Sequence, residues 1–343
     1  MDGDPILLFA GAVVLLAMGV PAFLALGGGG VRDLPIVGAA AVTAALGWIL
    51  LGWAGPVAVF QGAMASVSMA AVAAPLRARL GRAGAVVAAP ILVALVLVPL
   101  GVALFDVRSG LLADRWGALD FAGAAVLGLV PAVIGAVMAA PAPASPQTSS
   151  ARRWAVAAGV LAAIAAALLG SELVLDDAAP RLILALLVGA SGGAVGWVLA
   201  SVLLVHAVRV GEAAAGVVAG AISVLAAPLW LDAQTILVIA LLSALLGRIV
   251  AGRLGRRHAG LVGLLGVPAA LGLVAAGVNG DGRGLLASGQ TGLVVAQLVT
   301  VAVTVALSGG VALVIRGVAR WVRLRRAPDD RRRGTAEHAP GAR

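Results

Sequence analysis

Apolar runs of about twenty residues follow one another along the whole chain, and the short segments between them carry most of the charge. A helix rises about 1.5 Å per residue, so a run of this length crosses the hydrocarbon core of a bilayer. The pattern predicts an all-α, polytopic membrane protein with eleven transmembrane helices. The predicted spans are 5–27, 34–55, 57–76, 83–105, 118–140, 153–174, 182–205, 212–230, 233–252, 259–278 and 290–318.

Arginines alternate between the segments that join these spans. Segments on one side hold 20 of the 24 arginines, whereas those on the other hold ten of the fifteen acids. Basic residues are retained on the cytoplasmic side of a membrane. We therefore expect a multi-pass protein of the cell (plasma) membrane with its N-terminus outside and its C-terminus inside. Residues 1–320 form the transmembrane domain, and 321–343 form an arginine-rich cytoplasmic tail.

A weak internal repeat relates the fifth span to the tenth. The pairs Ala122-Gly123 and Pro131-Ala132 recur 137 positions later as Ala259-Gly260 and Pro268-Ala269. The Pro/Ser-rich segment 141–153 divides five spans from the following six. A unit with an odd number of spans forces its copy to enter from the opposite face. The sequence therefore predicts a 5+5 inverted repeat plus one extra helix.

Small residues recur at the spacing of helix contacts within the seventh and eighth spans. They let two backbones approach closely in lipid. The glycines concerned are Gly189, Gly192 and Gly196 in one span, and Gly216 and Gly220 in the next.

The amino-acid composition limits the kinds of chemistry that the protein can carry out. Hydrophobic residues make up 62% of the chain and charged residues 11%, a membrane composition. Cysteine and lysine are absent, which excludes disulfides, thiolate metal sites and a Schiff-base lysine. The arginines that give the net charge of +9 lie mainly in the segments expected on the cytoplasmic side of the membrane. Membrane topology explains their placement, so no nucleic acid is expected as a partner. We expect no enzyme activity, no cofactor and no metal.

One motif carries a specific signal. Asp120, in the stretch Gly-Ala-Leu-Asp-Phe-Ala-Gly at 117–123, stands at the head of the fifth apolar run. A carboxylate there accepts the free N–H groups of the first helical turn. The stretch resembles the fifth-helix signature of the ammonium transporter family (the Amt, Mep and Rh proteins). Phe60-Gln61-Gly62 resembles the third helix of that family, and 265–277 resembles the tenth.

The resemblance implies eleven helices, a trimer, and a pore in which aromatic rings and two histidines handle ammonium. The candidate pore and vestibule residues are Phe60 and Gln61, together with those at matched positions. Asp120 and Ser171 keep the residue type of the family. At the other matched positions this chain has a different residue type. Arg108 stands where the family has the vestibule Trp, and Met64 and Ala167 stand where it has the gate Phe residues. Gly128 and Leu265 stand where it has the pore His residues.

Several of these residues have a plainer explanation. Asp120 is a helix cap or, less simply, an ammonium ligand, and Ser171 is a helix-end hydroxyl or a recruiting ligand. Arg108 is an interfacial side chain or faces the vestibule. His206 and His258 lie beside arginines and suit a cytoplasmic interface, so neither replaces a pore histidine.

Two functions follow, and others stay open. The first is a channel that passes ammonia, ammonium or another small neutral solute through an apolar pore between the fifth and tenth helices. The second is a non-conducting relative that acts as a sensor or scaffold. A transporter of another substrate on the same scaffold is a third. Expected partners are the lipid bilayer, two further copies in a homotrimer, the small solute, and a cytoplasmic regulator at the arginine-rich tail.

Overall fold

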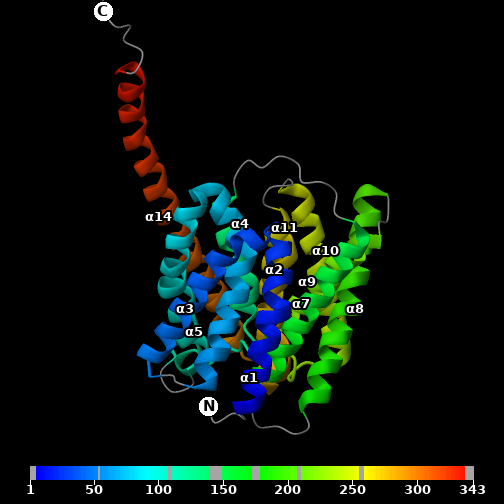
Figure 1. Ribbon diagram of the computed structural model, residues 1–343. Helices are drawn as coiled ribbons and strands as arrows, with labels where there is room; N and C mark the ends of the chain where they lie inside the picture. The colour runs from blue at the N-terminus through cyan, green and yellow to red at the C-terminus, as the bar shows by residue number, and fades with distance from the viewer. Residues whose placement is uncertain are drawn as a thin grey trace, which may run out of the picture.

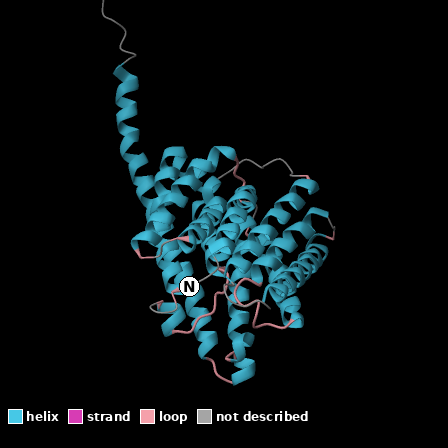
Figure 2. Cartoon of the chain, turned by 60° about the horizontal axis from the view of Figure 1, so that its bottom comes forward, coloured by secondary structure: helices cyan, strands magenta, loops and turns pink. Residues whose placement is uncertain are grey.

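The computed structural model describes residues 5–52, 55–106, 110–139, 149–171, 178–206, 210–254 and 259–336. Within these ranges the chain is helical and contains no strand (Figure 2). The helices run up and down a single bundle, and α14 extends beyond it at one end (Figure 1). Their exposed faces carry large apolar side chains, as a lipid-facing surface requires.

The first half of the chain folds into five groups of helical elements. They are α1 (Pro5–Val14), η1 (Leu15–Gly19) and α2 (Val20–Leu26); η2 (Val31–Asp33) and α3 (Leu34–Leu50); α4 (Pro56–Leu92); η3 (Val93–Leu97) and α5 (Val98–Phe105); and η4 (Leu111–Arg115), η5 (Ala125–Leu129) and α6 (Val130–Met138).

The second half begins with four helices that no π turn interrupts. They are α7 (Ser150–Ser171), α8 (Ala178–Val205), α9 (Val210–Ser223) and α10 (Ala233–Arg253), followed by α11 (Ala259–Leu261), η6 (Val262–Gly266), α12 (Val267–Asn279), η7 (Gly280–Gly282), α13 (Leu285–Ser288) and α14 (Gly292–Ala336). The helix α14 runs past residue 320, so residues 321–336 of the predicted tail continue the last helix.

Eight helices in the described ranges are long and apolar enough to cross a membrane. One of them, Pro56–Phe105, is 50 residues long and contains a break at Gly81, whose φ of 77° suits glycine. Two further apolar helices, Ala125–Met138 and Gly211–Ser223, are shorter. The predicted multi-pass helical architecture is confirmed, whereas the number eleven stays a prediction.

Four π-helical turns stand directly before a Val-Pro pair. A proline has no N–H, and its ring crowds the carbonyl four residues earlier. The wider turn relieves this crowding, and the valine before the proline donates its N–H to the carbonyl five residues back. These bonds join Val20 to Leu15, Val98 to Val93, Val130 to Ala125, and Val267 to Val262.

The glycines expected at helix contacts do bring backbones together. A Cβ on Gly220 of α9 would collide with the carbonyl oxygen of Gly189 on α8. A Cβ on Gly196 of α8 would collide with the carbonyl of Leu241 on α10. Helices α8, α9 and α10 therefore pack at backbone distance, as the spacing predicted.

Arginines of α4 and α14 lie near one another at the end of the bundle from which α14 extends (Figure 1), and we call this the arginine-rich end. Arg79 donates to the carbonyl of Ala139 at 2.7 Å, and Arg316 donates to that of Val137 at 3.0 Å. Arg77 forms an ion pair with Asp33, which is fully buried. The two hydrogen bonds tie α4 and α14 to the end of α6, and the ion pair ties α4 to η2.

Candidate pore between the two halves

Asp120 organises the loop before η5. Its two carboxylate oxygens accept the backbone N–H groups of Ala124 at 2.6 Å and Ala125 at 3.0 Å. The residue is 6% exposed, and its two bonds satisfy free N–H groups at the start of η5, as expected of a capping acid. The helix begins six residues later than 118, because Gly117 and Gly123 take φ values of 65° and 81° and hold 117–123 as a loop.

The same loop is bonded to the segment after α9. The N–H groups of Phe121 and Ala122 donate to the carbonyls of Ala226 and Leu225, both at 3.0 Å. The Phe121 ring meets Trp230 edge to face, with ring centroids 5.8 Å apart. The sequence analysis missed this half-buried aromatic pair, because 109 positions separate its members and no local motif marks Trp230.

Gly128 and Leu265, which are equivalent positions in the predicted repeat, lie against each other. A Cβ on Gly128 would stand 3.2 Å from the carbonyl oxygen of Leu265 and would collide with Ala269. Leu265 and Ala269 are fully buried. The helices η5 and η6 are therefore in direct contact at the two positions matched to the pore histidines.

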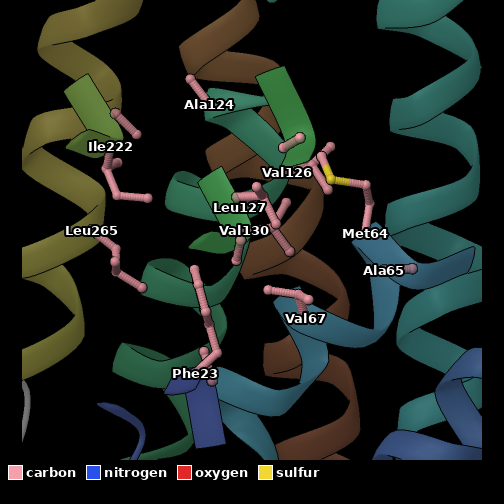
Figure 3. Packing of buried hydrophobic residues seen from close by; sticks show 14 of the residues in the cluster. Phe23, Met64, Ala65, Val67, Ala124, Val126, Leu127, Val130, Ile222 and Leu265 are labelled. Carbon is pink, nitrogen blue, oxygen red and sulfur yellow. The ribbon is translucent and has the colours of Figure 1, made fainter. Parts of the chain in front are cut away.

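Apolar side chains fill the space around this contact (Figure 3). We call Phe23, Met64, Leu127, Val130 and Leu265 the apolar centre. Each of the five is at most 2% exposed, so no water reaches them in this conformation. Phe23 and Val130 had no role in the sequence analysis. Hydropathy assigns them to a membrane span but does not say which face of the helix they occupy.

The candidates on the third span lie on α4 and are buried. Met64, matched to a gate ring, reaches toward the Asp120 loop, where its methyl carbon would be 3.0 Å from a Cβ on Gly123. Phe60 instead packs against Gly11 and Gly170. A Cβ on Gly170 would collide with the Phe60 ring, so this ring is fixed between α1 and α7. Gln61 is 8% exposed.

The remaining candidates are less completely described. Ala167, matched to the second gate ring, is fully buried on α7. Ser171 is the last residue of α7, and its side chain lies outside the described atoms, whereas Arg108 lies wholly outside the described residues. His206 is exposed at the end of α8, while His258 and His338 fall outside the described ranges.

Two polar contacts among the described residues reach the segment around Asp120. Ser68 of α4 donates to the carbonyl of Val126 at 2.8 Å, and Gln297 of α14 donates to that of Leu119 at 2.8 Å. Both acceptors belong to the segment around Asp120. Across the part of the chain that the structure describes, no three His, Cys, Asp or Glu side chains form a group able to hold a metal ion.

The bundle, its broken helices and the capped Asp120 loop define a polytopic membrane protein of the ammonium transporter fold. Mep2 of Candida albicans superimposes with a TM-score of 0.78 and 16% identity over 92% of this chain and 83% of that one. Mep2 of Saccharomyces cerevisiae superimposes with a TM-score of 0.76 and 17% identity over 91% of this chain and 87% of that one. A protein described as a sensor Amt protein superimposes with a TM-score of 0.75 and 14% identity over 93% of each chain.

No family model matches the sequence, and no curated protein matches it. Identities of 14–17% establish a shared fold alone.

Proposed function

We propose that this protein is a membrane channel that passes a small neutral solute, with ammonia as the best candidate, between its two halves. The observation that carries the proposal is the direct contact of η5 and η6 at Gly128 and Leu265, in a fold shared with ammonium transporters. The lining is apolar, so a bare cation would lose its hydration without replacement. A neutral molecule avoids that cost.

Eleven crossings in a 5+5 inverted repeat are part of the proposal. The break at Gly81 divides Pro56–Phe105 into two, which turns eight long helices into nine, and the two shorter apolar helices bring the number to eleven. The π turns support the repeat, because η6 begins 137 positions after η5 and each precedes a Val-Pro pair. The beginning of α1 and the end of α14 lie at opposite ends of the bundle (Figure 1), as an odd number requires.

The arginine-rich end is proposed to face the cytoplasm of a cell (plasma) membrane, with the N-terminus outside. The positive-inside rule supports this orientation. A homotrimer and a cytoplasmic regulator at residues 321–343 complete the proposal. The trimer follows from the resemblance to ammonium transporters, and the regulator from the arginines of the tail.

A second function is favoured by the packing itself. Phe23, Leu127 and Leu265 close the route between the halves, and each is fully buried. A protein that never opened this route would serve as a non-conducting sensor or scaffold. Conduction by the first function requires these side chains to rotate aside.

Stopped-flow measurement of internal pH after an ammonium pulse separates the two functions. Liposomes that contain the purified protein should alkalinise faster than empty ones, and Leu265→Phe should slow them by crowding the route. Leu242→Phe is the matched control, because Leu242 is 49% exposed on α10. Equal rates with and without protein would contradict the channel and leave the second function. A steady ammonium current would contradict passage of a neutral solute.

A further inference from the structure

The π turn η5 carries two residues of the candidate pore. Leu127 belongs to the apolar centre (Figure 3) and is fully buried, and Gly128 lies against Leu265 of η6. Leu127 closes the route between the halves together with Phe23 and Leu265, so conduction requires it to move aside. The winding of η5 therefore decides whether this side chain stands in the route.

The Val-Pro pair after η5 leaves one carbonyl of the turn without an α-helical or a π-helical donor. In an α-helix the N–H of Val130 would bond to the carbonyl of Val126. Here it bonds to the carbonyl of Ala125 instead. In a continued π-helix the Val126 carbonyl would accept from residue 131, which is a proline and has no N–H. A buried carbonyl without a donor is costly, so a group from another helix has to supply the bond.

Ser68 of α4 supplies that bond. Its hydroxyl donates to the Val126 carbonyl at 2.8 Å, across 58 positions of the chain. A serine inside a helix commonly bonds to the carbonyl four residues earlier in its own helix, as Ser66 does to Gly62 at 2.7 Å. Both serines are fully buried. The hydroxyl of Ser68 is therefore used on the neighbouring π turn and not on its own helix.

The related turn η6 is packed differently at the matching carbonyl. There the N–H of Val267 bonds to Val262, and the carbonyl that would be its α-helical acceptor is that of Gly263. A Cβ on Gly247 of α10 would collide with this carbonyl oxygen. Glycine has no side chain that can donate a hydrogen bond. Ser68 therefore gives η5 a support that Gly247 cannot give η6.

We propose that Ser68 is a latch, a positioning residue that holds η5 in its π form and Leu127 in the apolar centre. The inference rests on the proposed channel, because it names what keeps the route closed. When the Ser68 hydroxyl is released, the Val126 carbonyl can accept the N–H of Val130, and the turn winds as an α-helix. The closing bond then spans four residues instead of five, so the side chains inside the turn rotate about the helix axis. This rotation carries Leu127 out of the route.

The first test compares Ser68→Ala with Ser66→Ala in the ammonium pulse on liposomes. Ser68→Ala should speed alkalinisation about fivefold, since loss of one typical hydrogen bond shifts an equilibrium by about that factor. Ser66→Ala removes an equally buried hydroxyl from the same helix and should stay within about twofold of the wild type. A serine with a purely structural role would give a slower or unchanged rate. Equal rates for Ser68→Ala and the wild type, both above empty liposomes, would overturn the latch and leave the channel.

Pro131→Ala releases the same turn from its other end. It supplies the missing N–H and removes the ring that crowds an α-helix, so it should also speed permeation. Pro99→Ala is the control, because Pro99 follows the π turn η3, which contains no residue of the apolar centre. Its rate should stay within about twofold of the wild type. Equal effects of the two proline variants, in proteins with unchanged elution volume and circular dichroism, would overturn η5 as the turn that moves.

A thiol at position 265 gives a readout that does not depend on ammonium. The chain has no cysteine, so Leu265→Cys introduces a single thiol on the side of the route that faces η5. Methyl methanethiosulfonate, a small neutral reagent, should modify it about fivefold faster when Ser68→Ala is added, and not when Ser66→Ala is added. Equal modification rates in the three backgrounds would overturn the latch. If no variant moves ammonium faster than empty liposomes, the proposed channel fails, and the thiol rates alone decide for or against the latch.

Discussion

The apolar centre and the polar cluster of α8, α9 and α10 hold the helices together by opposite means. In the centre, Phe23, Leu127 and Leu265 meet with no exposed surface, so only volume decides the fit. In the cluster, Trp197, Ser201, Glu212 and Arg248 share hydrogen bonds at 2.8–3.3 Å. A close-packed centre is destabilised by any change of side-chain volume, whereas a polar cluster loses most of its stabilising effect when one member is removed.

Removal of Glu212 should have the largest effect. Glu212→Ala leaves the Trp197 N–H and the Arg248 guanidinium, 16% exposed, without their shared acceptor. The expected loss is about 3 kcal/mol of unfolding free energy. Unfolding by SDS titration, followed by tryptophan fluorescence, measures it. Glu212→Gln keeps an acceptor oxygen and should lose less than half as much; an equal loss would mean that charge alone holds the cluster.

Overpacking at Gly128 should have the next largest effect. Gly128→Ala places a methyl group against Ala269 and should cost about 2 kcal/mol. The double variant Gly128→Ala/Ala269→Gly moves the methyl group from one helix to the other and should recover at least half of the loss. The same SDS titration checks both. If the double variant is as unstable as the sum of its parts, the two helices do not meet through this contact.

The helices, the glycine contacts and the Asp120 cap could be predicted from the sequence. Each depends on a local pattern: an apolar run, a spacing of glycines, or an acid at the head of an apolar run. The sequence also related Gly128 to Leu265 through the repeat, but a repeat relates positions and does not say that the two residues touch. It could not predict that the Phe121 ring packs against Trp230. Nor could it predict that Gln297 donates a hydrogen bond to the carbonyl of Leu119, 178 positions away. In a chain this rich in Ala, Val and Leu, hydropathy fixes depth in the membrane but not which residues face each other.

A smaller change in stability, of opposite sign, is expected from a polar residue that is buried on α14. Thr304 is fully buried, and its hydroxyl has no hydrogen-bond partner among the described residues. Thr304→Val should therefore stabilise the protein by about 1 kcal/mol. Thr300→Val is the control, because its hydroxyl donates to the Ala296 carbonyl at 2.9 Å and its loss should not stabilise. Thermal unfolding by circular dichroism compares them; a destabilised Thr304→Val would mean that this hydroxyl is hydrogen-bonded.

The smallest effect is expected at Asp232, the exposed counterpart of the buried cap Asp120. Its carboxylate accepts from Thr235 N at 2.8 Å and from the Thr235 hydroxyl at 2.9 Å, and these bonds lower the pKa of Asp232. A carboxyl with a lowered folded-state pKa stabilises the fold above its unfolded pKa and loses that contribution as pH falls through the folded pKa. Wild type should therefore melt slightly above Asp232→Asn at neutral pH, and the gap should close in acid. A gap that persists at acidic pH would show that the α10 cap acts through shape rather than charge.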